Sequence, residues 1–197
     1  MTEYTLAGWK ASLLGFLFIF PVVVLYVFPY LIIWYRDTEI ANLLPAVVKR
    51  NRTAFVAVIE AKWLCAMLLA MSIVLHELIH GVCMAIGASK GWKSVSFGFN
   101  MKSLTPYAHC KEPLTPATYR TSLLMPALLL GEIPVFVGWC TGNALWLLYG
   151  ILMLWAAGGD CIILFMSRKI KSNVTIQDHP DKIGFIAVTD ESTVMIG

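Results

Sequence analysis

The chain has 197 residues, of which 58% are hydrophobic and only 14% are charged, and its mean hydropathy is +0.73. This composition excludes an ordinary water-soluble domain and indicates an integral membrane protein. The formal net charge is +3, and no stretch of interleaved basic and aromatic residues suggests nucleic-acid binding. We therefore expect a single membrane-embedded domain over residues 1–197, with the lipid bilayer as its surroundings.

Four hydrophobic segments predict an all-α fold with about four transmembrane helices. The first span is expected at about residues 13–35, where Pro21 and Pro29 predict kinks. This apolar run is longer than the core of a signal peptide, so we expect it to be retained as a helix. A short connection that includes the basic residues 49–52 follows, and the second span is expected at about residues 63–86.

A polar loop rich in Gly, Pro, Ser and Thr occupies residues 87–119, after the second span. Within it, residues 94–99 alternate between polar and apolar side chains, which is the pattern of a β-strand. The predicted fold therefore contains a small β-containing loop between the second and third helices.

The second half of the chain predicts two more spans and a polar tail. The spans are expected at about residues 121–139 and 144–166, and the tail at residues 167–197. In the tail, residues 178–181 predict a turn and residues 183–188 predict a strand.

Basic residues predict the orientation of these spans. Four spans place both termini and the central loop on one side, which then carries ten Lys and Arg residues against four on the other, with Lys62 left aside as interfacial. Because Lys and Arg favour the cytoplasmic side, both termini are expected in the cytoplasm.

The second span contains an HExxH motif formed by His76, Glu77 and His80. Histidines four residues apart lie on one face of a helix and can bind the same zinc ion. Glu77 is placed to accept a proton from a water bound to that ion. The alternative is a buried, hydrogen-bonded pair of histidines with an incidental glutamate. A metal site is favoured because ionisable groups are rare within membrane spans unless they have a function.

A zinc site of this kind needs a third protein ligand, and Asp160 is the preferred candidate. His80 lies ten residues from the basic Lys90, or roughly 15 Å along a helix. Asp160 lies eight residues from Arg168, or roughly 12 Å. The second and fourth spans run in the same direction, so both groups are expected at a similar depth.

Three other residues are weaker candidates for the site. Glu132 is twelve residues, or roughly 18 Å, from Arg120 and could be a ligand, a partner of an imidazole, or a group lining the water path. The last two roles are favoured. Cys83 shares the helical face of the histidines, although packing is the preferred explanation there. His109 in the central loop could reach the mouth of the site or simply be solvated.

These residues resemble those of the site-2 protease group of intramembrane zinc metalloproteases. The similarity is closer to a bacterial family of putative zincin peptidases, which are compact four-span membrane proteins. It rests on residues 76–81 (HELIHG), residues 106–113 (PYAHCKEP) and the pair Gly159 and Asp160. Site-2 proteases usually present their aspartate in an Asn-Pro-Asp-Gly-like context, and the Gly-Gly-Asp-Cys sequence here departs from it.

The resemblance implies a zinc-dependent intramembrane endopeptidase of the bacterial inner membrane that hydrolyses membrane-associated protein or peptide substrates. His76, His80 and Asp160 would hold Zn²⁺, and Glu77 would be the catalytic base. Residues 94–99 could pair with an unwound substrate segment. The alternatives are a catalytically inactive membrane protein that binds zinc or partners and, less favoured, a metal-ion transporter. Transport needs polar groups along a path across the bilayer, whereas these residues cluster at one depth.

Overall fold

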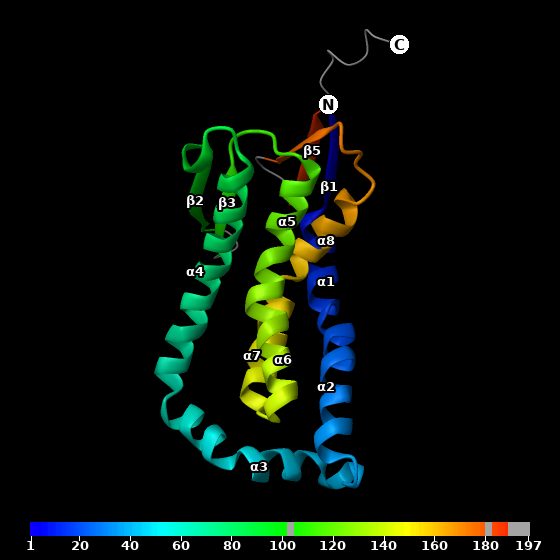
Figure 1. The fold of residues 1–197 in the computed structure, drawn as a ribbon, viewed down its shortest axis with the longest axis vertical. Coiled ribbons are helices and arrows are strands. Elements are labelled where there is room, and N and C mark those ends of the chain that lie inside the picture. The colour runs from blue at the N-terminus through cyan, green and yellow to red at the C-terminus, as the bar shows by residue number, and fades with distance from the viewer. Residues whose placement is uncertain (102–104, 180–182, 189–197) are drawn as a thin grey trace. The chain divides into compact units, whose positions relative to one another are not determined.

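The computed structural model describes residues 1–101, 105–179 and 183–188, and it is mostly helical (Figure 1). The helices are α1 (Gly8–Leu17), α2 (Ile19–Tyr35), α3 (Ile40–Glu60), α4 (Lys62–Gly87), the 3₁₀ turn η1 (Gly91–Ser94), α5 (Pro116–Pro126), the π-helical η2 (Ala127–Glu132), α6 (Ile133–Thr141), α7 (Ala144–Ala156) and α8 (Gly158–Ser167). The strands are β1 (Thr2–Leu6), β2 (Val95–Asn100), β3 (Thr105–Cys110), β4 (Thr175–Asp178) and β5 (Ile183–Val188).

The chain forms two compact units. The first unit contains Met1–Gly15, Ile73–Pro126 and Gly158–Gly197, and the second contains Phe16–Ser72 and Ala127–Ala157. Each unit has its own cluster of buried apolar side chains.

Helices of membrane-spanning length are the main feature of the fold. Three stretches are long and apolar enough to cross a membrane, namely Gly8–Tyr35, Lys62–Gly87 and Pro116–Thr141. A fourth is present if α7 and α8, which meet at a bend of 50°, are taken as one span. A 26-residue helix is about 39 Å long, which exceeds the ~30 Å hydrocarbon layer. The four spans expected from hydropathy fall within these stretches.

The segment between the first two spans corrects the sequence prediction. A short connection is expected around residues 49–52, whereas the structure forms the 21-residue helix α3 there. Its backbone leaves helical geometry at Ala61 (φ −94°, ψ 27°), which separates α3 from α4. Glu60 and Lys62 flank this break, and the second span predicted from about residue 63 begins just after it. The hydropathy pattern does not predict that the residues before the break form a helix.

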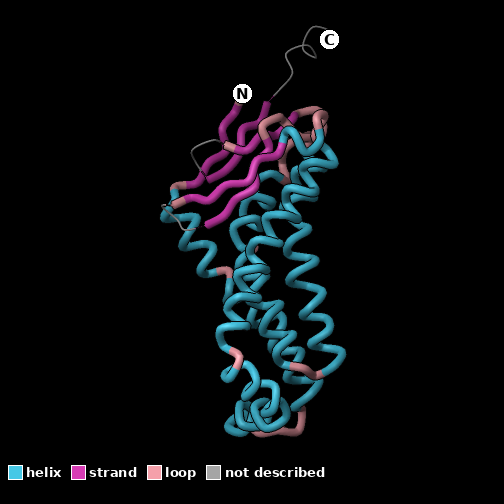
Figure 2. Tube along the Cα trace, turned by 90° about the vertical axis from the view of Figure 1, so that its left-hand side faces the viewer, coloured by secondary structure: helices cyan, strands magenta, loops and turns pink. Residues whose placement is uncertain are grey.

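The five strands belong to the first unit and lie together at one end of it (Figure 2). β2 pairs with β3, and β5 lies between β1 and β4, all antiparallel. The strands expected at residues 94–99 and 183–188 are observed as β2 and β5. The sequence did not predict β1, β3 or β4: the partner of β1 is at the other end of the chain, and β3 contains Pro106. The turn expected at residues 178–181 lies partly outside the described residues.

Glu112 orders the loop that leads from α4 into β2. The hydroxyls of Ser89 and Ser94 donate hydrogen bonds of 2.6 and 2.5 Å to its carboxylate, and the backbone N–H of Lys90 donates one of 3.2 Å. These donors, that of Ser89 first, lower the pKa of Glu112 to about 2. The carboxylate therefore stays ionised and links three residues that follow α4.

The second unit packs its helices closely through glycines. Its buried core comes from α2, η2, α6 and α7. A Cβ atom on Gly138 would lie 2.7 Å from the backbone nitrogen of Leu147, and one on Gly150 would lie 2.6 Å from the carbonyl oxygen of Gly131. Small residues are required there because the helix backbones are in near contact.

Candidate metal centre

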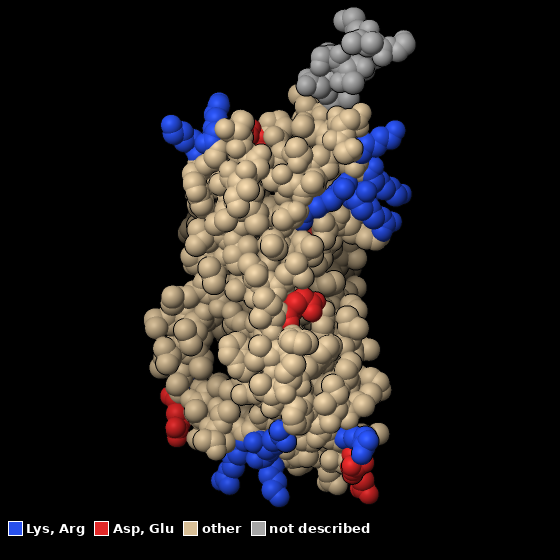
Figure 3. Space-filling view, viewed as in Figure 1, with Lys and Arg blue, Asp and Glu red and all other residues tan. Residues whose placement is uncertain are grey.

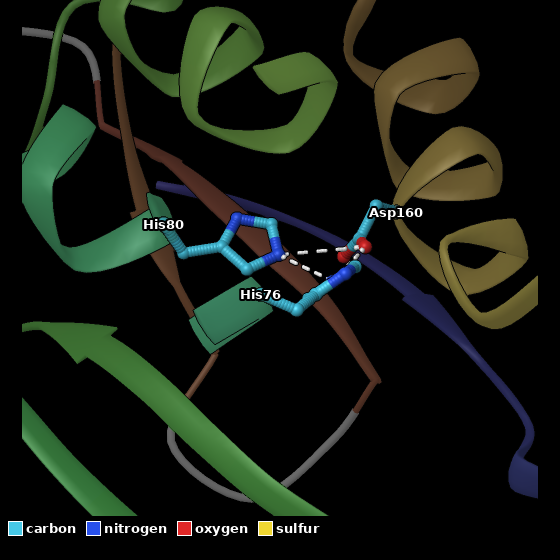
Figure 4. A group of neighbouring side chains, drawn as sticks. All are labelled: His76, His80 and Asp160. Carbon is cyan, nitrogen blue, oxygen red and sulfur yellow. Dashed lines mark hydrogen bonds and ion pairs between the residues drawn. The ribbon is translucent and has the colours of Figure 1, made fainter. Parts of the chain in front are cut away.

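Helix α4 presents His76 and His80 on the same face, one turn apart. The histidines are only 7% and 5% exposed, and their Nε2 atoms are 3.1 Å apart. Both rings point toward the same position in front of the helix (Figure 4). The i, i+4 spacing therefore brings two imidazole nitrogens together at a buried point in the first unit.

Asp160, in the first turn of α8, completes a group of three potential ligands. Its Oδ2 atom lies 3.0 Å from Nε2 of His76 and 3.4 Å from Nε2 of His80 (Figure 4). The ligand atoms of all three residues lie within 4.8 Å of one another. Ligand atoms about 2.0–2.1 Å from a tetrahedral zinc ion are separated by roughly 3.3 Å. The three atoms thus have nearly the spacing that a metal ion requires.

The surroundings of His80 fit a metal ligand. The carbonyl of Ser122 on α5 lies 2.8 Å from Nδ1 of His80 and accepts a hydrogen bond there. With its proton on Nδ1, the neutral imidazole has a lone pair on Nε2, where the three ligand atoms converge. Nδ1 of His76 is buried and has no hydrogen-bond partner among the described residues. Two imidazoles and one carboxylate form a donor set that suits zinc and leaves a fourth position free.

Glu77, which follows the first histidine, contacts the backbone of β3. The N–H of Ala108 donates a hydrogen bond of 2.8 Å to its Oε2 atom. This contact joins the glutamate of the HExxH motif to the hairpin between α4 and α5. It involves a main-chain donor, so no side-chain pattern in the sequence points to it.

His109 lies on β3 beside Ala108 and pairs with an acidic residue outside the group of three. Its Nδ1 atom is 3.6 Å from Oδ2 of Asp178 on β4. The hydroxyl of Tyr119 also hydrogen-bonds Asp178. Burial raises the pKa of the Asp178 carboxyl, while the Tyr119 hydrogen bond and the nearby His109 act in the opposite direction. Asp178 was predicted only as part of a turn, and the sequence gives no sign of this pairing.

Glu132 belongs to the second unit, where it ends η2. The hydroxyl of Tyr26 on α2 donates a hydrogen bond to its Oε1 atom. The structure thus gives this carboxylate a phenol as its polar partner. A role for Glu132 as a ligand or as a group on the water path stays a prediction.

A membrane-length helix that supplies two histidines, facing an aspartate from a second helix, defines a class of site used by metallopeptidases. The sequence model of a family described as "Putative zincin peptidase" matches residues 69–175, just over half of the chain. The chain therefore belongs to this family. The match includes both histidines, Glu77 and Asp160. No curated protein and no solved structure matches the chain.

Proposed function

We propose that this protein is a zinc-dependent intramembrane endopeptidase, similar in its chemistry to site-2 proteases. The observation that carries the proposal is the convergence of His76, His80 and Asp160 within 4.8 Å in a member of a zincin peptidase family. The membrane-length helix that holds both histidines supports hydrolysis within the bilayer rather than in bulk water.

Each residue of the site has a separate role in this proposal. His76, His80 and Asp160 would hold the ion, and the burial of the two histidines limits the access of bulk water to it. Zinc, when bound, supplies a Lewis acid that activates a water and stabilises negative charge on the substrate carbonyl. A carboxylate oxygen of Glu77 would accept the proton of the attacking water and pass it to the leaving amine. The pairing of His109 with Asp178 suits a role next to the substrate rather than on the metal.

Besides β2, strand β3 offers an edge to a substrate segment, as its register indicates. The carbonyl oxygen of Ser94 accepts a 2.8 Å hydrogen bond from the N–H of Lys111. Every second residue pair along the β2–β3 ladder, counted from Ser94 and Lys111, is therefore a backbone hydrogen-bonded pair. Phe97 and Ala108 form one of the intervening pairs that are not hydrogen-bonded to each other. The backbone N–H of Ala108 therefore points away from β2. This N–H reaches Glu77 instead. A substrate segment laid along this edge would compete with Glu77 for the same donor and free the carboxylate.

Replacing Ala108 with Pro tests this edge. The change removes the N–H donor and spares the β2–β3 ladder, because Pro106 already occupies an equivalent outward-facing position. The Ala108→Pro variant should bind zinc normally and show a KM raised roughly 2- to 10-fold, the value of one hydrogen bond, with little change in kcat. Ala108→Val keeps the donor and is the matched control. An equal KM in the Pro variant and the parent protein would contradict substrate pairing at this position.

The proposed location is the bacterial inner membrane, crossed four times, with both termini in the cytoplasm. Four membrane-length stretches support this arrangement if α7 and α8 form one span. The excess of basic residues on the side of the termini supports the orientation. Reporter fusions at each terminus and after Arg36 test it, since the proposal requires the last fusion to be extracytoplasmic.

The proposed activity is tested by metal removal. Membrane proteins are incubated with the purified chain before and after treatment with a chelator, and new peptide N-termini are identified by chemical labelling. We expect cleavage products with the metal-loaded protein, their loss after chelation and their return with added Zn²⁺. A metal-loaded protein that yields no chelator-sensitive products would instead support the inactive zinc-binding alternative.

A further inference from the structure

Helix α3 packs with one face against the other helices of the second unit. Leu43, Val47 and Phe55 of this face pack against the buried core of the unit. Asn51, which is buried on the same face, accepts a hydrogen bond of 3.3 Å from the backbone N–H of Ala144 at the start of α7. The helix therefore has a defined rotation, and its other faces have a fixed direction.

Beside this packing face, and overlapping its edge, α3 exposes large apolar side chains. Ile40, Leu44 and Ile59 are 88%, 73% and 70% exposed, and Val48 is exposed with them. At 3.6 residues per turn, Leu44, Val48 and Ile59 fall within an arc of roughly 60°. We refer to these three residues as the apolar stripe. Contiguous exposed apolar side chains of this kind usually mark a surface that contacts a membrane or a partner.

Basic side chains border the apolar stripe. Lys49 and Arg52 are exposed and lie at its polar edge, while Arg50 stacks on Trp34 with its guanidinium carbon 4.4 Å from the ring centroid. Lys and Arg side chains gather over α3 in the space-filling view (Figure 3). Apolar groups flanked by cations match a phospholipid surface, which offers acyl chains beneath anionic headgroups.

The connections of α3 limit its depth. It follows the membrane-length stretch Gly8–Tyr35 after four residues, and the stretch Lys62–Gly87 begins one residue after its end. A helix joined this closely at both ends to membrane-crossing helices lies where they leave the hydrocarbon layer. We propose that α3 is an interfacial helix that inserts its apolar stripe into the headgroup region of an anionic phospholipid bilayer. The inference rests on the membrane placement in the proposed function and is independent of catalysis.

The depth of α3 is measured with the full chain reconstituted in vesicles of phosphatidylcholine and phosphatidylglycerol. A fluorescent coumarin amino acid replaces either Leu44, on the apolar stripe, or Thr53, on the opposite polar face. We expect nitroxide-labelled lipids to quench the probe at position 44 most strongly, at a depth roughly 5–10 Å into the headgroup and acyl boundary. Aqueous iodide should preferentially quench the probe at position 53.

The charge requirement is measured in the same vesicles. Phosphatidylglycerol should raise the Tm of the chain relative to pure phosphatidylcholine, and the pair Lys49→Gln and Arg52→Gln should abolish most of this rise. The pair Lys169→Gln and Lys171→Gln, in the first unit, removes the same charge and should preserve it.

Three outcomes overturn the inference. Equal iodide quenching at both positions places α3 in water. Shielding of position 44 that grows with the protein-to-lipid ratio shows that a second copy covers the stripe. Release of the chain from vesicles by alkaline carbonate removes the membrane placement itself, and with it the intramembrane location of the proposed activity. The first two results leave that activity untouched.

Discussion

Replacement of Glu77 by Gln is expected to abolish peptide cleavage while leaving the metal in place. Gln has nearly the same shape as Glu, and its amide oxygen can still accept the hydrogen bond from Ala108. It cannot take a proton from a water, so turnover should fall by about 10²- to 10⁴-fold, the usual contribution of a general base. Because Glu77 is not one of the three converging ligands, zinc content should equal that of the parent protein.

The Glu77→Gln experiment needs two measurements on the same preparation, zinc stoichiometry by elemental analysis and cleavage of a substrate identified by new N-termini. Glu39→Gln is a matched control, because it makes the same chemical change at an exposed residue next to α3. Cleavage by Glu77→Gln at the rate of this control would rule out Glu77 as the base. Loss of zinc from Glu77→Gln would show that the carboxylate supports the metal instead.

The central geometry of the candidate site follows from regular helix geometry. The i, i+4 spacing of the histidines fixes both rings on one face of α4, whatever the rest of the fold does. A constant rise per residue allowed depth to be counted from Lys90 and Arg168, and this count paired Asp160 with the histidines. The structure places Oδ2 of Asp160 3.0 Å from Nε2 of His76. Within helices, sequence distance translates directly into position.

Other parts of the site depend on contacts that side-chain patterns do not encode. The carbonyl of Ser122 and the N–H of Ala108 are main-chain groups, which every residue except proline offers equally. Asp178 meets His109 only because β4 and β3 lie side by side in the folded unit. Pairings between segments this far apart in sequence depend on the whole topology of the strands. Helix α3 is not predicted, because its exposed Lys and Arg residues resemble those of a polar connection between two spans.

The third ligand can be tested by exchanging a carboxylate for an amide at Asp160. Asn has nearly the same volume as Asp, so Asp160→Asn removes the negative charge and the stronger donor with little change in packing. Loss of a residue that only orients a metal ligand weakens binding about 10- to 100-fold, so loss of a direct ligand should exceed about 100-fold. After desalting, Asp160→Asn should therefore contain almost no zinc.

Glu132→Gln is the matched control for Asp160→Asn, because it makes the same change at the other carboxylate within the membrane-length helices of the second half of the chain. Its hydrogen bond from Tyr26 can be kept by the amide oxygen, so zinc content should stay at the parent level. Both variants are compared by zinc stoichiometry and by Tm, which separates loss of metal from loss of fold. Full zinc in Asp160→Asn together with its loss in Glu132→Gln would transfer the ligand role to Glu132. Loss in both at an unchanged Tm would indicate that the two carboxylates act together on the ion.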